Sequence, residues 1–224
     1  MPFSGIAQIG FLKGVVWLSQ LKAVILNCSL KTSDEESNTD ALIEKFTSTF
    51  DKKNVESEVI RVADYSLGYG ITDYTGAGDE WPTILAKVKQ ANIVILASPV
   101  WLGEKSSISK LVLERLNGSS DETNQKGQPI FYNKVGGAVV TGNEDGAKKS
   151  AGELIFGLAQ LGFIIPPNPL AYWVGDAGPG PSYIEAEGYK SEFTRENATM
   201  ASHNLVHLAE MFQAHPIPTE GNAS

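Results

Sequence analysis

Three loops of this sequence carry residues suited to ligand binding, and each directly follows an apolar run. In residues 98–104 (SPVWLGE), which follow the run 93–97, Pro99 has a fixed φ and no amide proton. Gly103 permits close approach of the backbone, and Trp101 offers a broad apolar face. The pattern predicts a wall for a planar ring, and a packed aromatic residue at a strand end is the alternative. The candidate contacts are Ser98, Pro99, Val100, Trp101, Leu102, Gly103 and Glu104.

The loop at residues 27–39 is rich in hydroxyl groups and precedes a predicted helix. Hydroxyls, one lysine and the free amides of a helix N-terminus suit a phosphate group. The acidic triplet 34–36 would repel an anion unless its side chains point away, and an ordinary polar N-cap loop is the alternative. The residues that could contact a phosphate are Ser29, Lys31, Ser37, Asn38 and Thr39.

The third loop, residues 141–146 (TGNEDG), follows a predicted strand that contains two glycines. It offers backbone amides and short polar side chains at the next edge of the same crevice, although it would also serve as an N-cap loop. Because ligands of parallel α/β sheets bind at the carboxyl ends of the strands, we expect the three loops to meet there. The candidate contacts in this loop are Thr141, Gly142, Asn143 and Gly146.

Other kinds of catalytic or binding site find no support in the sequence. No Gly-x-Ser-x-Gly nucleophile elbow, Walker lysine motif or complete dinucleotide-binding glycine fingerprint is present. His203 and His207 stand one helical turn apart and could be metal ligands, but a solvated helix face is the favoured interpretation. No pair of carboxylates stands out as an acid/base couple, and we predict no metal site.

The elements that must position these loops alternate along the chain from residue 21. Apolar runs predict strands at 22–27, 56–62, 92–97, 134–141 and 163–165. Amphipathic stretches predict a helix that begins near residue 38 or 39, with Asn38 as a good N-cap. They predict others at 82–90, 108–116 (closed by Gly118 at C′), 151–158 and 192–212. Strict alternation indicates the α/β class, with a flavodoxin-like, doubly wound parallel sheet in the order 2-1-3-4-5 and helices on both faces, in three layers.

Length and composition set further bounds. The 224 residues suffice for one domain, and the formal charge of −8 disfavours nucleic acid as a partner. Cys28 is the only cysteine, so no intramolecular disulfide forms, and we expect it to be a packed residue in a cytoplasmic protein. Residues 1–20 lack the basic start of a signal peptide and are too polar for a membrane span, which predicts an N-terminal extension packed on the domain or a neighbouring subunit, or partly disordered. The expected division is 1–20, 21–215 and a tail at 216–224.

At these loops the sequence closely resembles the NAD(P)H-dependent FMN reductase family of the flavodoxin-like superfamily. The Pro-x-Trp-x-Gly and Gly-Asn-Glu-Asp-Gly loops in succession are specific to it, and the resemblance spans residues 21 to about 212. Two departures concern the first loop: Cys28-Ser29 replaces the Gly-Ser pair of many relatives, and the triplet 34–36 is inserted. The matching segments are 29 with 37–39, 78–82, 98–107, 112–116, 142–147 and 175–183.

The resemblance implies FMN held without a covalent bond. The first loop would hold its phosphate, residues 99–104 would lie along the isoalloxazine, and residues 141–146 would lie beside the polar edge of the ring. NADPH or NADH would be the co-substrate, and a quinone, a flavin or a similar small molecule would be the acceptor. Trp101 and Gly103 would lie in the ring environment, and hydride transfer by FMN would require no titrating catalytic side chain. Residues 176–183 either close over the flavin, contact a neighbouring subunit or form a surface connection.

The resemblance also implies a cytoplasmic homodimer or homotetramer with no membrane or nucleic-acid partner. The alternative function is a flavodoxin-type electron-transfer protein, or a flavin-binding protein, without nicotinamide turnover. The net charge of −8 is compatible with the acidic docking face of such a carrier.

Overall fold

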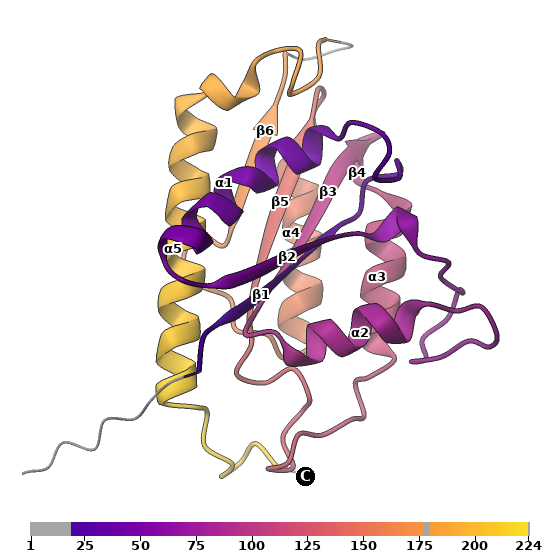
Figure 1. The fold of residues 1–224 in the computed structure, drawn as a ribbon, viewed down its shortest axis with the longest axis vertical. Coiled ribbons are helices and arrows are strands. Elements are labelled where there is room, and N and C mark those ends of the chain that lie inside the picture. Colours follow the sequence, from indigo (N-terminus) through magenta and orange to yellow (C-terminus); the bar gives the residue numbers. More distant parts are fainter. Residues whose placement is uncertain (1–18, 177–179, 224) are drawn as a thin grey trace, which may run out of the picture.

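The computed structural model describes residues 19–176 and 180–223. Its centre is a parallel sheet in the order β2-β1-β3-β5-β6, with β4 paired antiparallel to the end of β3 (Figure 1). The parallel strands thus have the predicted 2-1-3-4-5 order, and the flavodoxin-like class is confirmed. The strands are β1 (Lys22–Asn27), β2 (Glu56–Arg61), β3 (Ile93–Trp101), β4 (Glu104–Lys105), β5 (Val135–Gly142) and β6 (Leu170–Val174).

Helices cover both faces of the sheet and give the three predicted layers. In β1, Ala23 and Ile25 pack into the core beneath α1 and α5, whereas Val24 and Leu26 pack into the core beneath α2, α3 and α4. Burial on both faces explains why the strands read as continuous apolar runs. The helices are α1 (Asn38–Lys52), α2 (Trp81–Gln90), α3 (Ser107–Asn117), α4 (Ala147–Gln160) and α5 (Glu192–Ala214), with the short turns η1 (Val62–Asp64) and η2 (Gly188–Lys190).

The prediction of a fifth strand at 163–165 is wrong. In that segment Ile164 forms only an isolated bridge with Val135, and the fifth parallel strand is β6, for which no strand was predicted. Three prolines between residues 166 and 169 delay the strand, because proline cannot donate to a ladder. β6 lies at the sheet edge with alternating burial, and its Ala171 and Trp173 pack beneath α5.

Two smaller corrections concern helix ends. Ser37 caps α1, accepting a hydrogen bond from the amide of Asp40 at 3.3 Å, so Asn38 is the first helical residue rather than the cap. Gly118 at the end of α3 has φ −60°, which is not the left-handed conformation expected of a C′ glycine. A Cβ there would lie 2.7 Å from the backbone of Thr72, so this glycine is required by close packing.

The structure describes two residues of the predicted extension and most of the predicted tail. The predicted extension 1–20 lies outside the described residues except for Ser19 and Gln20. In the predicted tail, the amide of Ile217 donates to Asn133 Oδ1 at 2.7 Å. The division at residues 20 and 215 stays a prediction. Among the described helices, none combines the length and the apolar composition that a bilayer crossing requires.

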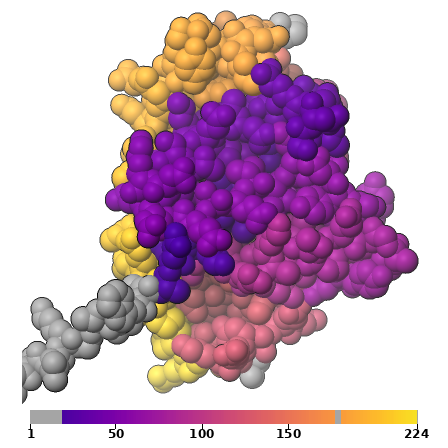
Figure 2. All heavy atoms as spheres, viewed as in Figure 1, coloured from indigo at the N-terminus to yellow at the C-terminus, as the bar shows by residue number. Residues whose placement is uncertain are grey.

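Figure 2 shows the face of the molecule on which the N-terminal part of the domain lies. Atoms of the indigo and purple segment, which contains β1, α1 and β2, occupy much of this face in the space-filling view, with α5 in yellow along one side (Figure 2). Cys28 is fully buried at the end of β1, as expected of a packed residue, and its burial raises the thiol pKa to about 12. A thiol held protonated in this way is a poor nucleophile.

Candidate functional site

The three predicted loops meet in a cleft of about 520 Å³ at the carboxyl ends of β1, β3 and β5. Other hollows lie between α3 and α4 (about 670 Å³) and beside α1 and β2 (about 460 Å³), away from those strand ends. Position at the switch point of the sheet, rather than volume, singles out this cleft. Its lining residues are Lys31, Asn38, Pro99, Val100, Trp101, Leu102, Thr141, Gly142, Asn143, Glu144, Ser182 and Tyr183.

The second loop is a tight hairpin between β3 and β4. Both central residues, Leu102 (φ 53°) and Gly103 (φ 75°), have the positive φ that a type I′ turn requires. Leucine is strained in this region, yet the Leu102 side chain is 93% exposed beside Trp101, which is 55% exposed. The hairpin thus presents an apolar surface at the mouth of the cleft. Glu104 turns to an ion pair with Lys149.

The second and third loops touch through their backbones. A Cβ on Gly146 (φ 118°) would lie 2.6 Å from Cα and O of Gly103, and a Cβ on Gly142 would lie 2.9 Å from Val100. Only glycine permits these approaches. The Leu102 amide also donates to Glu144 Oε1 at 3.1 Å. These contacts fix the two loops relative to one another.

Four predicted contacts are buried and do not line the cleft, namely Ser29, Ser37, Thr39 and Ser98. The hydroxyls of Thr39 and Thr141 are 2.9 Å apart and join α1 to β5. Ser98 Oγ donates to the Pro99 carbonyl at 2.8 Å, and Ser37 caps α1. Ser29, also buried, accepts from the Lys31 amide at 3.3 Å. These hydroxyls hold the loops in place, and their contact with a ligand stays a prediction.

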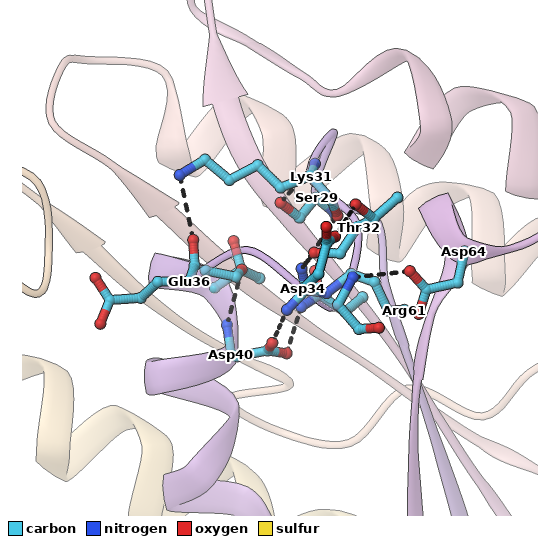
Figure 3. A network of polar contacts seen from close by, with 12 residues as sticks. Ser29, Lys31, Thr32, Asp34, Glu36, Asp40, Arg61 and Asp64 are labelled. Carbon is cyan, nitrogen blue, oxygen red and sulfur yellow. Dashed lines mark hydrogen bonds and ion pairs between the residues drawn. The ribbon is translucent and has the colours of Figure 1, made fainter.

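The end of the cleft that the sequence predicts to bind a phosphate has free backbone amide donors. Asn38 and Thr39 open α1, and their amides have no hydrogen-bond partner within the described chain. The acidic triplet 34–36 is exposed and does not line the cleft, so its carboxylates lie outside the space that an anion would occupy. Figure 3 shows Lys31 above this loop, with Nζ donating to the Glu36 carbonyl at 3.2 Å. The donors suit an anion.

Sequence reasoning missed Glu144, Ser182 and Tyr183 as lining residues. The segment 180–184 is joined to the first loop, where Asn38 Oδ1 accepts from the Ile184 amide at 2.9 Å. It is joined to the third loop, where Asn143 Nδ2 donates to the Gly180 carbonyl at 2.9 Å. The sequence signal that could have found them is Tyr183, an aromatic residue within a stretch rich in glycine and proline. Residues 177–179 of the same segment lie outside the described part.

Tyr183 is the most buried of the polar side chains that line the cleft. Its ring packs edge-on against Trp173, with centroids 5.5 Å apart, and its hydroxyl has no hydrogen-bond partner among the residues described. Burial, with a smaller contribution from the charge of Glu44, raises the pKa of this phenol to about 12. Tyr183 is therefore neutral at physiological pH and can only donate or accept a hydrogen bond.

The arrangement fits a ligand with a planar ring and an anionic group. Trp101 and Pro99 supply the apolar wall, and the amides of Asn143 and Glu144 have no partner in the described part of the chain and border the same space. No group of three metal-ligating side chains occurs among the described residues. His203 and His207 lie exposed on α5, as the solvated-face interpretation predicted.

Comparisons with known proteins agree with this chemistry. A model of the family described as NADPH-dependent FMN reductase matches residues 21–177. The 8-demethyl-8-aminoriboflavin-5′-phosphate synthase of Streptomyces davaonensis is 38% identical over 209 residues, covering 89% of this chain and 81% of that protein. A crystal structure of RosB with a bound intermediate, 8-demethyl-8-formylriboflavin-5′-phosphate, is 38% identical with a TM-score of 0.81, covering 88% of this chain and 82% of that one.

A further relative is a Mycobacterium bovis protein named divalent metal cation transporter MntH. It is 40% identical over 200 residues, which is 87% of this chain. The chain spans only 29% of the length of that relative.

Proposed function

The chain belongs to the NADPH-dependent FMN reductase family, and on this basis we propose that it is an FMN-dependent NAD(P)H oxidoreductase that reduces a small-molecule acceptor such as a quinone or a flavin. FMN is the flavin of this family, with a reduced nicotinamide as co-substrate. The convergence of the three predicted loops on one cleft carries the proposal. When bound, FMN supplies the hydride and electron chemistry.

The chain's own residues bind and orient the flavin in this proposal. The amides of Asn38 and Thr39 would hold the phosphate, with Lys31 nearby. Residues 99–102 would lie along the ring, and the amides of Asn143 and Glu144 would face its polar edge. Preorganised amides at that edge stabilise the negative charge that the ring gains on reduction.

No side chain of the cleft has to act as a catalytic acid or base. Its ionisable lining residues are Lys31, Glu144 and Tyr183. The carboxylate of Glu144 accepts from the Leu102 amide, and Tyr183 stays protonated because burial raises its pKa to about 12. The exposed Trp101–Leu102 surface leaves room for a nicotinamide or acceptor ring to stack.

A second candidate function is chemical modification of a flavin 5′-phosphate as substrate. It is favoured by the 38% identity, over most of both chains, to a protein named as an aminoriboflavin phosphate synthase. The same cleft would hold the flavin in either case, because both ligands share the ring and the phosphate. A flavodoxin-type carrier is the third possibility.

Turnover followed by mass analysis of the flavin separates these functions. The purified protein with one equivalent of FMN is given NADPH or NADH and a quinone. An oxidoreductase oxidises many equivalents of nicotinamide and returns FMN of unchanged mass. A second incubation contains FMN, oxygen and an amino-group donor, and a changed flavin mass there would support the synthase-like function. No nicotinamide oxidation and no change in flavin mass would support the carrier.

We also propose a cytoplasmic homodimer or homotetramer. The assembly is supported by the exposure of several large apolar side chains, since such surfaces commonly mark subunit contacts. These side chains are Tyr69, Ile71, Trp101, Leu102 and Phe156. The location is supported by a single free cysteine, which suits a reducing compartment. Sedimentation velocity tests the assembly, and a monomer at all concentrations would contradict it.

A further inference from the structure

Arg61 lies behind the first loop, at the carboxyl end of β2, and nothing in the proposed function yet uses it. Its side chain is only 7% exposed. The guanidinium donates from Nη1 to the carbonyl of Lys31 at 3.0 Å and to that of Thr32 at 2.8 Å, and Nη2 pairs with Asp40 (Figure 3). A buried cation thus ties together the loop and the first turn of α1.

These contacts place Arg61 on the far side of the loop from the cleft. Lys31 lines the cleft, whereas Arg61 and Asp40 line the separate hollow beside α1 and β2. The two loop carbonyls therefore direct their negative ends to the guanidinium, away from an anion in the cleft. The Ser33 amide is fixed on that side as well, donating to Asp64 Oδ1 at 2.8 Å.

Arg61 also changes the charge near the N-terminus of α1. Asp40 lies in the first turn of α1, two residues from Asn38, and a free carboxylate there would oppose an anion at the helix N-terminus. Arg61 neutralises it, and the Asn27 amide group donates to its other oxygen. The Arg61 side chain is buried whereas that of Asp40 is 38% exposed, so water screens this pair in part, less than it would a fully exposed surface pair.

We propose that Arg61 is a positioning residue for the 5′-phosphate of the flavin and makes the site select FMN over riboflavin. It does so by turning two carbonyls away from the cleft and by cancelling the charge of Asp40. This inference rests on the proposed binding of FMN in the cleft. It concerns only the phosphate end, so riboflavin, which has the same ring without the phosphate, is the discriminating ligand.

The test compares affinities of the full chain for FMN and riboflavin, measured by quenching of flavin fluorescence. We expect Arg61→Gln to weaken FMN binding by about tenfold or more, the effect of losing charge-assisted hydrogen bonds, and riboflavin binding by less than about threefold. Arg61→Lys should fall between, because lysine restores the charge but not the planar fork. Adding Asp40→Asn to Arg61→Gln should recover part of the FMN affinity.

Arg195→Gln is the matched control, since Arg195 is exposed on α5. It should leave both affinities unchanged. Equal losses for FMN and riboflavin in Arg61→Gln, or no loss of FMN affinity, would overturn the inference while the proposed function stands. If Arg61→Gln does not fold, judged by the melting of the apoprotein, the same ratio in Arg61→Lys decides. A wild-type protein that binds neither flavin would overturn the proposed function itself.

Discussion

Replacing Gly146 by alanine is expected to separate the second and third loops and to weaken FMN binding. The added Cβ would lie 2.6 Å from Cα and O of Gly103. Carbon atoms pack at about 3.5 Å or more, so one loop must withdraw by roughly 1 Å. The φ of 118° adds strain of about 1–2 kcal/mol for any L-residue other than glycine.

The expected results are a loss of FMN affinity of about tenfold or more, equivalent to about 1.4 kcal/mol, and a fall in the melting temperature of the apoprotein of roughly 2–8 °C. Fluorescence titration and thermal melting measure the two effects separately. The fall in melting temperature reports strain, whereas the loss of affinity reports the geometry of the cleft.

Gly152→Ala is the matched control on the same helix, α4. A Cβ at Gly152 meets nothing within 4 Å, so alanine should raise the free energy of unfolding by about 0.5–1 kcal/mol and leave FMN affinity unchanged. Wild-type FMN affinity in Gly146→Ala would refute the argument that the contact between the two loops shapes the site.

Three further predictions concern the ring wall, the hairpin and a buried ion pair. Trp101→Ala should weaken FMN binding by about 1 kcal/mol in a titration, whereas Phe156→Ala, which removes an exposed side chain of α4, should not. Leu102→Asn should raise the free energy of unfolding by up to about 1 kcal/mol, because Asn-Gly is a favoured type I′ pair; a lower melting temperature would show that the leucine makes stabilising contacts. Arg115 holds the pKa of the buried Asp79 well below its usual range, so stability from this pair is complete above about pH 4 and is lost as the pH falls below it. Arg115→Met should cost roughly 3–5 kcal/mol at pH 7 in denaturant titrations, and a deficit that does not shrink at acid pH would contradict the assignment.

The sheet and the ligand loops could be predicted because their signals are local. Runs such as 93–97 are continuous in the sequence, and the loops that follow parallel strands must meet at one edge. Trp101 and Asn143 line the same cleft for that reason. The predicted roles of these residues toward FMN stay predictions until binding is measured.

The parts that could not be predicted depend on contacts between distant segments. β6 is short, half-buried and preceded by three prolines, so its pattern is weaker than that of the apolar run at 163–165. Arg61 and Asp40 are 21 residues apart, and no pattern in the chain pairs them. Ser182 and Tyr183 lie in a segment that hydrogen bonds join to Asn38 and Asn143, which are far from it in the sequence.

The measurement that tests the central claim most directly is an anaerobic absorption spectrum of the protein loaded with FMN, recorded before and after addition of NADPH or NADH. The account predicts flavin bands that bleach rapidly to the two-electron reduced form, and slower bleaching in Gly146→Ala at saturating FMN. Bound flavin that ignores both nicotinamides would contradict the oxidoreductase function, and a protein that does not bind FMN would contradict the assignment of the cleft.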